Sequence, residues 1–257
     1  MASVAYVRRF SRTERALHWI HASAFFVLLG SGLVLYLPAL SVAVSNRPLV
    51  KAIHVYTAIA WLLALAAVVL VGDRRGLRRT LRELDLFDRD DRRWLSAHPA
   101  PQGRFNAGQK VNAALTGAFA VLFAVSGFLL WYGERNTDFR WTSTIILHDG
   151  LTIASVFLVM GHLYLALVHP TTRHALRGMT LGSVREDWAR QHHAKWVHRM
   201  SRRLNERPTP RQAVLRTVLG HRSHLRGRGE GDMDHGPPAS TFMYPRPPAG
   251  ARALTVD

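Results

Sequence analysis

Four histidines lie inside membrane-length apolar segments of this sequence, and their positions divide them into two pairs. His18 and His162 lie toward one side of the predicted bilayer, and His54 and His148 lie toward the other. Imidazole is a common axial ligand of haem iron, and ionisable residues inside a membrane usually have a function. Two pairs of histidines at opposite depths therefore indicate two b-type haems held across a membrane.

The segments that carry these histidines have the length of membrane-spanning helices. A helix rises about 1.5 Å per residue, so about 20 apolar residues cross a hydrocarbon layer of roughly 30 Å. Four stretches meet this requirement and give predicted spans at about residues 16–40, 52–72, 111–133 and 146–169. The sequence therefore predicts an all-α, polytopic membrane protein, in which residues 16–169 form a four-transmembrane-helix bundle with two b haems.

The distribution of positive charge predicts the orientation. Arginine and lysine concentrate in the N-terminal arm 1–15, in the loop 73–110 and in the segment 170–205. Because cytoplasmic loops of membrane proteins carry such an excess, both termini and this loop are predicted to be cytoplasmic. The net charge of +17 is then explained by topology and by anionic membrane lipids, so no nucleic-acid partner is predicted.

This topology brings the histidines together in pairs from different helices. His18 is near the cytoplasmic start of span one, and His162 is in the cytoplasmic half of span four. His54 and His148 open spans two and four on the outer side. His148 and His162 are 14 residues apart, close to four helical turns, which places them on nearly one face about 21 Å apart. Span four can therefore supply a ligand to both haems.

The histidines also have an ordinary structural explanation, since a polar side chain can hydrogen-bond a neighbouring helix. Four of them at matching depths favour haem ligation. His21 points away from His18 by about 60°, and His169 lies at the end of span four, so both fit a ligand role poorly. The positions of His98, His192 and His193 predict solvated side chains.

The chain contains no cysteine. It therefore cannot hold an ordinary cysteine-ligated iron–sulfur cluster, attach a c-type haem or form a disulfide. Any resident redox centre must be held by histidine or methionine.

Small residues interrupt two of the spans. These residues are Gly30, Ser31 and Gly32 in span one and Ser126 and Gly127 in span three. Small side chains would let a flat porphyrin approach the backbone, and tight helix packing explains them equally well.

The remaining segments predict polar structure outside the membrane. Within the loop, residues 82–85 and 88–91 mix arginine with acidic residues, which favours solvated salt bridges on helix surfaces. The segment 170–205 predicts a cytoplasmic surface helix with Trp188 and Trp196 facing lipid or a partner. Residues 206–257 are rich in Arg, Pro and Gly and predict a disordered basic tail.

The sequence resembles the gamma subunit of membrane-bound formate dehydrogenase, a di-haem cytochrome b, over roughly residues 7–200. The resemblance rests on the four histidines with their neighbours and on three longer strings. These strings are Arg15-Ala16-Leu17-His18-Trp19, Phe105-Asn106-Ala107-Gly108-Gln109-Lys110 and Trp188-Ala189-Arg190-Gln191-His192-His193-Ala194-Lys195-Trp196.

The resemblance implies specific roles for these residues. It makes His54 and His148 ligands of an outer haem, and His18 and His162 ligands of an inner haem. It also makes Asn106, Gly108 and Gln109 candidates for binding a quinone, either menaquinone or ubiquinone. Amide groups beside the membrane surface suit a quinone head group, although Asn106 could instead cap the third span.

The family also implies partners and a location. The partners are an iron–sulfur subunit and a catalytic subunit with a molybdenum or tungsten cofactor, in a bacterial cytoplasmic (inner) membrane. The chain itself would have no formate-oxidising site and would pass electrons to the quinone. Two alternatives remain: a cytochrome b subunit of a nickel–iron hydrogenase or another quinone-linked reductase, and a haem-free four-helix scaffold or transporter.

Overall fold

The computed structural model describes residues 4–205, and within them four helices are long and apolar enough to cross a membrane. They are α1 (Arg12–Tyr36), α3 (Arg47–Val71), α6 (Ala107–Gly133) and α7 (Thr142–Leu163), which a π-helical turn, η2 (Tyr164–Val168), extends. These helices contain the four predicted spans almost entirely. The predicted all-α, four-helix membrane fold is thus confirmed.

The first three long helices begin at polar residues that satisfy their first backbone amides. Ser11 caps α1, and its hydroxyl and the Glu14 carboxylate form a reciprocal capping box. Asn46 caps α3 and Asn106 caps α6. Each of these helices therefore begins four or five residues before its predicted span, because the cap lies before the apolar segment.

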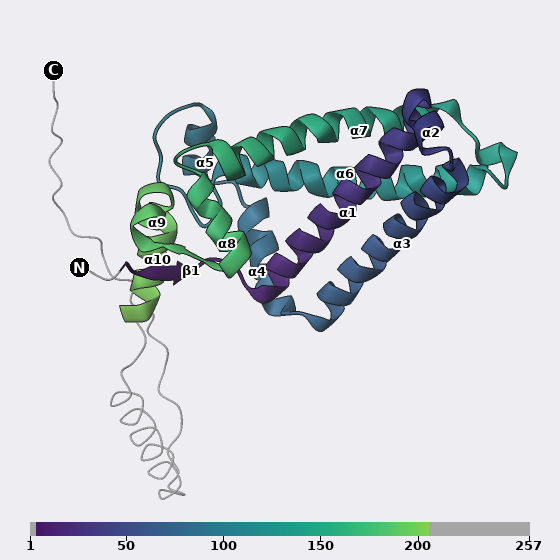
Figure 1. The fold of residues 1–257 in the computed structure, drawn as a ribbon. Helices are drawn as coiled ribbons and strands as arrows, with labels where there is room; N and C mark the ends of the chain where they lie inside the picture. Colours follow the sequence, from purple (N-terminus) through teal and green to yellow (C-terminus); the bar gives the residue numbers. More distant parts are fainter. Residues whose placement is uncertain (1–3, 206–257) are drawn as a thin grey trace, which may run out of the picture. The chain divides into compact units, whose positions relative to one another are not determined.

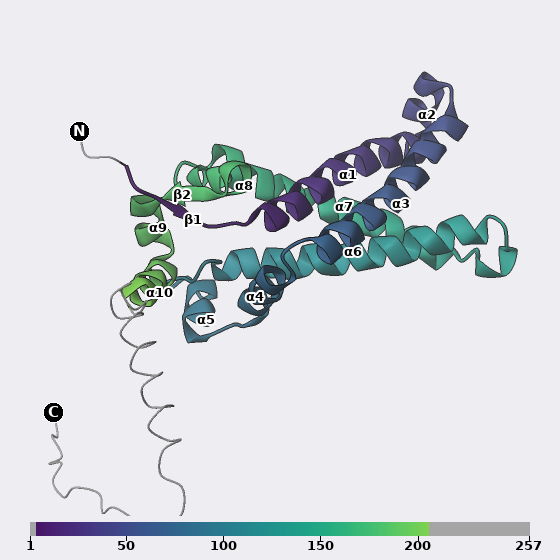
Figure 2. The same ribbon diagram turned by 90° about the horizontal axis from the view of Figure 1, so that it is seen from below.

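The long helices are paired along the chain (Figures 1 and 2). α1 packs along α3, and α6 packs along α7. A short helix, α2 (Pro38–Val44), lies between α1 and α3, and a single 3-10 turn, η1 (Thr137–Phe139), lies between α6 and α7. Each pair is thus a helical hairpin.

The polar segments gather at the end of the long helices opposite α2 (Figure 1). We call residues 4–11, 73–106 and 170–203 the polar cap. Its elements are β1 (Tyr6–Arg8), α4 (Arg74–Asp85), α5 (Arg89–Leu95), η3 (Arg173–Ala175), α8 (Leu176–Leu181), β2 (Ser183–Arg185), α9 (Glu186–His192) and most of α10 (Ala194–Asn205). β1 pairs antiparallel with β2, with Tyr6 opposite Arg185.

The single surface helix predicted for residues 170–205 is wrong. α8 ends at Gly182, whose φ of 84° ends the helix and directs the chain into β2. Trp188 does not face lipid: it is buried in a small core that also contains the residues Val184, Ala189 and Val197. Trp196 packs against the same core. The segment folds onto the N-terminal arm instead of lying on the surface as one helix.

Among the charged residues of the loop, Arg82, Asp85, Asp88 and Arg89 are exposed as predicted, whereas Asp91 is buried, and so is Arg104 outside the predicted segments. The guanidinium of Arg104 contacts the carboxylates of Glu14 at 2.8 Å and Glu83 at 2.6 Å, and it donates to the carbonyl of Arg9 at 3.0 Å. Arg104 is only 7% exposed. One side chain therefore links the N-terminal arm, α1 and α4.

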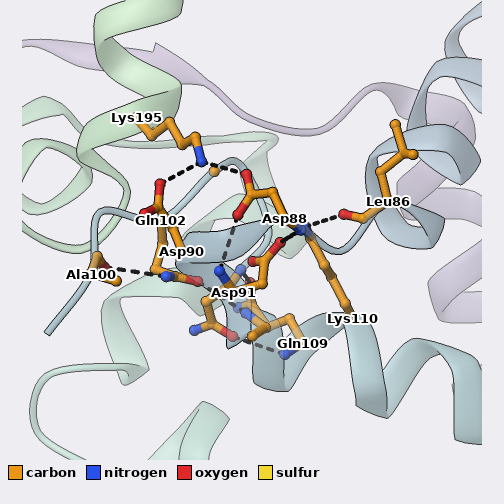
Figure 3. A network of polar contacts seen from close by, with 12 residues as sticks. Leu86, Asp88, Asp90, Asp91, Ala100, Gln102, Gln109, Lys110 and Lys195 are labelled. Atoms are coloured by element: carbon orange, nitrogen blue, oxygen red, sulfur yellow. Dashed lines mark hydrogen bonds and ion pairs between the residues drawn. The ribbon is translucent and has the colours of Figure 1, made fainter. Parts of the chain in front are cut away.

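A second ion pair attaches α5 to the start of α6 (Figure 3). Lys110 Nζ lies 2.6 Å from Asp91 Oδ2 and also donates to the carbonyl of Leu86 at 2.7 Å. Both charged side chains are buried. Lys195 of α10 pairs with Asp88 and Asp90 on the other side of this network. The predicted tail 206–257 lies outside the described residues.

Candidate functional site

The outer histidine pair joins the two helical hairpins. His54 comes from the second turn of α3 and His148 from the second turn of α7. Their ring centroids lie 6.4 Å apart, with the planes inclined at 65°. The two side chains thus meet from different hairpins, as the predicted pairing requires.

The inner pair has nearly the same geometry. His18, from the second turn of α1, and His162, near the end of α7, have ring centroids 6.2 Å apart and planes inclined at 54°. α7 therefore contributes one histidine to each pair.

These distances fit a haem iron between each pair of rings. Metal–imidazole bonds are about 2.0–2.1 Å long, and each nitrogen lies about 1.1 Å from its ring centre, so two axial imidazoles have centroids about 6.3 Å apart. The observed separations of 6.2 and 6.4 Å lie on either side of this value. Directly packed rings can also reach such separations, as His193 and Trp196 do at 6.4 Å, so the case for haem rests on two histidine pairs from different helices together with the distance. The donor sets therefore suit haem b.

Two serines orient the outer pair. Ser31 Oγ lies 2.9 Å from Nδ1 of His54, and Ser126 Oγ lies 2.9 Å from Nδ1 of His148. Each hydroxyl also donates to a carbonyl one turn earlier in its own helix, Val27 or Leu122, both at 2.7 Å. The contacts leave Nε2 of each histidine available to a metal.

Glycines follow both serines and face the same imidazole rings. A Cβ atom added to Gly32 would lie 3.4 Å from Cε1 of His54, and one added to Gly127 would lie 3.5 Å from Cε1 of His148. The small residues noted in the sequence thus line the outer pair. Sequence reasoning identified their size but missed the serine hydrogen bonds, because these depend on the rotation of each helix about its axis.

The other histidines have different surroundings. His21 packs against Trp61, with ring centroids 5.6 Å apart. His169 contacts the hydroxyls of Thr171 and Thr172. His193 is 1% exposed, so the prediction of a solvated side chain is wrong: its Nδ1 donates to the carbonyl of Gly103 at 2.7 Å. Burial lowers the pKa of His193 to about 3, with a further contribution from the cation of Arg9.

The quinone candidates lie at the start of α6, where they form a capping box. Asn106 Oδ1 accepts from the amide of Gln109 at 2.8 Å, and Gln109 Oε1 accepts from the amide of Asn106 at 3.1 Å. The capping alternative for Asn106 is therefore confirmed. Within residues 4–205, neither side-chain NH₂ group has a hydrogen-bond partner, so both remain donors. A Cβ at Gly108 would approach the ring of Trp94 to 3.1 Å.

A buried arginine adjoins this capping box, and it was not predicted. Nη2 of Arg9 donates to Gln109 Oε1 at 3.1 Å and to the carbonyl of Arg104 at 2.7 Å. Nε and Nη1 are buried without a hydrogen-bond partner in the described residues, and the guanidinium lies over the ring of Trp188, 5.5 Å from its centroid. Burial, together with the nearby charge of Arg104, lowers the pKa of Arg9 to about 9, which still leaves it cationic at neutral pH. The sequence around Arg9 has no periodic pattern from which its burial could be predicted.

Comparison with known proteins places this geometry in a family. A family model described as prokaryotic cytochrome b561 matches residues 9–182. The cytochrome b556(fdo) subunit of formate dehydrogenase from Escherichia coli K12 is 26% identical over 207 residues, which cover 77% of this chain and 95% of that protein.

Two further relatives have related names. The cytochrome b556(Fdn) subunit of the nitrate-inducible formate dehydrogenase from Escherichia coli K12 is 21% identical, covering 74% of this chain and 89% of that protein. The formate dehydrogenase cytochrome b556 subunit of Haemophilus influenzae is 23% identical, covering 71% and 78%. Because the family match extends over more than half of the chain and includes all four long helices and both histidine pairs, this membrane protein belongs to the prokaryotic cytochrome b561 family.

Proposed function

We propose that this protein is the membrane cytochrome b subunit of a formate dehydrogenase complex, and that it passes electrons from an iron–sulfur subunit through two bis-histidine haems to a membrane quinone. The observation that carries this proposal is that two histidine pairs join the hairpins with ring centroids 6.2 and 6.4 Å apart, so that each pair could hold an iron between its rings. The printed names of the relatives supply the formate dehydrogenase context.

The protein's own contribution is to hold and orient these groups. His54 and His148 would hold the outer haem, and His18 and His162 the inner haem. Haem b, when bound, supplies one-electron redox chemistry inside the membrane. Each ligand pair joins the two hairpins, and α7 fixes the separation between the pairs, since His148 and His162 lie on one rigid helix.

The quinone would bind where α6 begins, beside the inner pair. The NH₂ groups of Asn106 and Gln109 are available to a carbonyl acceptor, because the capping box uses only their oxygens. Arg9 adds a cation next to Gln109. This end carries the basic segments, which supports a cytoplasmic location for quinone reduction and proton uptake in a bacterial inner membrane.

Haem content in purified variants tests the ligand assignment. We expect two haems per chain by pyridine haemochrome analysis, and one after His54→Ala, His148→Ala, His18→Ala or His162→Ala. His21→Ala is the matched control, since His21 also lies within α1 but packs on Trp61. Two haems in every variant would rule out the assigned pairs, and no haem in the parent protein would favour the haem-free scaffold or transporter.

The catalytic partner requires a separate test. Formate should reduce both haems in membranes that contain the whole complex, and a molybdenum- or tungsten-cofactor subunit should copurify with this protein. Reduction by hydrogen but not by formate would instead identify a hydrogenase partner, while leaving the haem assignment intact.

A further inference from the structure

The outer histidine pair contains hydrogen bonds that the inner pair lacks. Ser31 contacts His54 and Ser126 contacts His148, each with 2.9 Å between Oγ and Nδ1. Within residues 4–205, the ring nitrogens of His18 and His162 have no hydrogen-bond partner. The two sites thus have matching ring separations but different surroundings.

The direction of each hydrogen bond follows from the other contact of the serine. A hydroxyl has one proton, and in both serines that proton is directed to a carbonyl of the preceding turn, Val27 O or Leu122 O. The oxygen can then only accept from the imidazole. Nδ1 of each histidine must therefore carry the proton, and Nε2 keeps the lone pair that binds iron.

We propose that Ser31 and Ser126 are positioning residues that fix the Nε2-ligating tautomer of the outer haem ligands and lower the reduction potential of that haem relative to the inner one. This inference rests on the proposed ligands. An imidazole that donates its other N–H becomes a more basic ligand, which stabilises oxidised iron over reduced iron. Both ligands of the outer haem make such a bond and, within the described residues, neither ligand of the inner haem does. The outer haem should therefore have the lower reduction potential, which favours electron transfer from the outer haem to the inner haem.

The two contacts also have the same construction in both hairpins. The serine precedes its histidine by 23 residues in one case and by 22 in the other. In each case the serine lies on the first long helix of a hairpin and the histidine near the start of the second. A glycine follows each serine and faces the same ring. Tight packing alone would require small residues at these positions but would not require a hydroxyl.

Potentiometric titration of the haem absorbance tests this inference. We expect Ser126→Ala to favour the reduced form of the outer haem by about tenfold, the scale of a lost ligand contact, which is a rise of about 59 mV for one electron. The outer haem is identified as the one lost in His148→Ala. The potential of the inner haem should not change. Ser31→Ala should act in the same direction, because Ser31 contacts the other ligand of the same haem.

Two further variants separate positioning from packing. Ser126→Thr keeps a hydroxyl and should restore the parent potential. Ser155→Ala is the matched control: Ser155 is a buried serine of α7 between the two histidines, and its hydroxyl donates only to the carbonyl of Thr152. It should change neither potential.

Each outcome is decisive. Loss of the outer haem in Ser126→Ala that threonine restores supports the positioning role, whereas loss that threonine does not restore overturns it. An unchanged outer potential in both alanine variants, with two haems retained, also overturns it. These results leave the proposed function standing, because that proposal fails only if the parent protein lacks the two haems or keeps both in the histidine variants.

Discussion

Asn106 has two separable roles at the scale of a single residue. Its oxygen caps α6, whereas its NH₂ group is free to meet a quinone. Asn106→Asp keeps the capping oxygen and removes the NH₂ donor, so we expect normal stability but slow reoxidation of the haems by quinone. Gln109→Glu should behave likewise, since its oxygen completes the capping box. Stopped-flow reoxidation after reduction by formate measures the effect.

Asn106→Ala provides the comparison. Losing the cap should cost about 1 kcal/mol of stability, and losing the donor should slow reoxidation as in Asn106→Asp. Normal reoxidation in all three variants, with full haem content, would move the quinone site away from the start of α6.

His193 predicts a pH dependence of the polar cap. Its folded pKa of about 3 lies below the unfolded value of 6.5, because burial and Arg9 disfavour the charged form. Below pH 6.5 the unfolded chain therefore binds a proton that the folded protein does not, and stability falls as the pH falls toward 3. The slope is at most about 1.4 kcal/mol per pH unit.

The protection factors of the backbone amides of α9 and α10, measured by hydrogen exchange at pH 7.5 and pH 5, test this dependence. His193→Asn retains a donor near the position of Nδ1 but does not titrate. The variant should therefore lose the contribution of His193 to the pH dependence of stability and keep the contribution of the carboxylates. If the protection factors fall by the same amount between pH 7.5 and pH 5 in the parent and the variant, the pH dependence cannot be assigned to His193.

The sequence predicted the elements unequally. The long helices follow from uninterrupted apolar length, and the start of α1 follows from the local pattern of Ser11 and Glu14. β1, β2 and the short helices of the polar cap were missed, because contacts between residues far apart in sequence stabilise them. Val184 and Trp188, for example, are buried only when the strand at residues 183–185 pairs with residues 6–8.

The same distinction holds for the candidate site. The histidine pairs could be predicted because a helix converts sequence position into depth and face. The contact of Ser31 with His54 could not, since it depends on how α1 rotates against α3. The burial of Arg9 and Arg104 likewise depends on the docking of three separate segments.

The packing of α5 on α6 depends on a buried ion pair. Lys110→Ala would leave the carboxylate of Asp91 buried and unpaired, so we expect a loss of about 3–5 kcal/mol of stability. Lys51→Ala is the matched control, because the pair between Lys51 and Glu134 is nearly half exposed and should contribute at most about 1 kcal/mol. Thermal unfolding in detergent compares the two variants.

A double variant checks the cause. Lys110→Met with Asp91→Asn removes both charges. The asparagine keeps a side-chain oxygen that can accept from the backbone amide of Asp88, which now donates to Asp91 Oδ2 at 2.9 Å. Much of the lost stability should return. A double variant that is as unstable as Lys110→Ala would show that the charge left on Asp91 is not the cause.

At the scale of the whole described chain, the polar cap brings the three basic segments to one side. β1 pairs with β2, Arg104 bonds to the N-terminal arm, and His193 bonds to Gly103 in the loop. These contacts require residues 4–11, 73–106 and 170–203 to share one side of the membrane. They support the four-span topology independently of the charge pattern, since a topology that separates any two of these segments would break the contacts.

Cysteine labelling tests this topology, because the chain has no cysteine of its own and an introduced cysteine is its single labelling site. His98 lies exposed in the loop between α5 and α6, and Thr137 lies exposed in the turn between α6 and α7. An impermeant maleimide should label Thr137→Cys in intact spheroplasts but His98→Cys only after permeabilisation. The two sites are separated by the single helix α6, so labelling of both in intact spheroplasts would mean that α6 does not cross the membrane. The reverse pattern would keep four spans but place the polar cap and the quinone candidates outside, where proton uptake could not contribute to charge separation in the proposed direction.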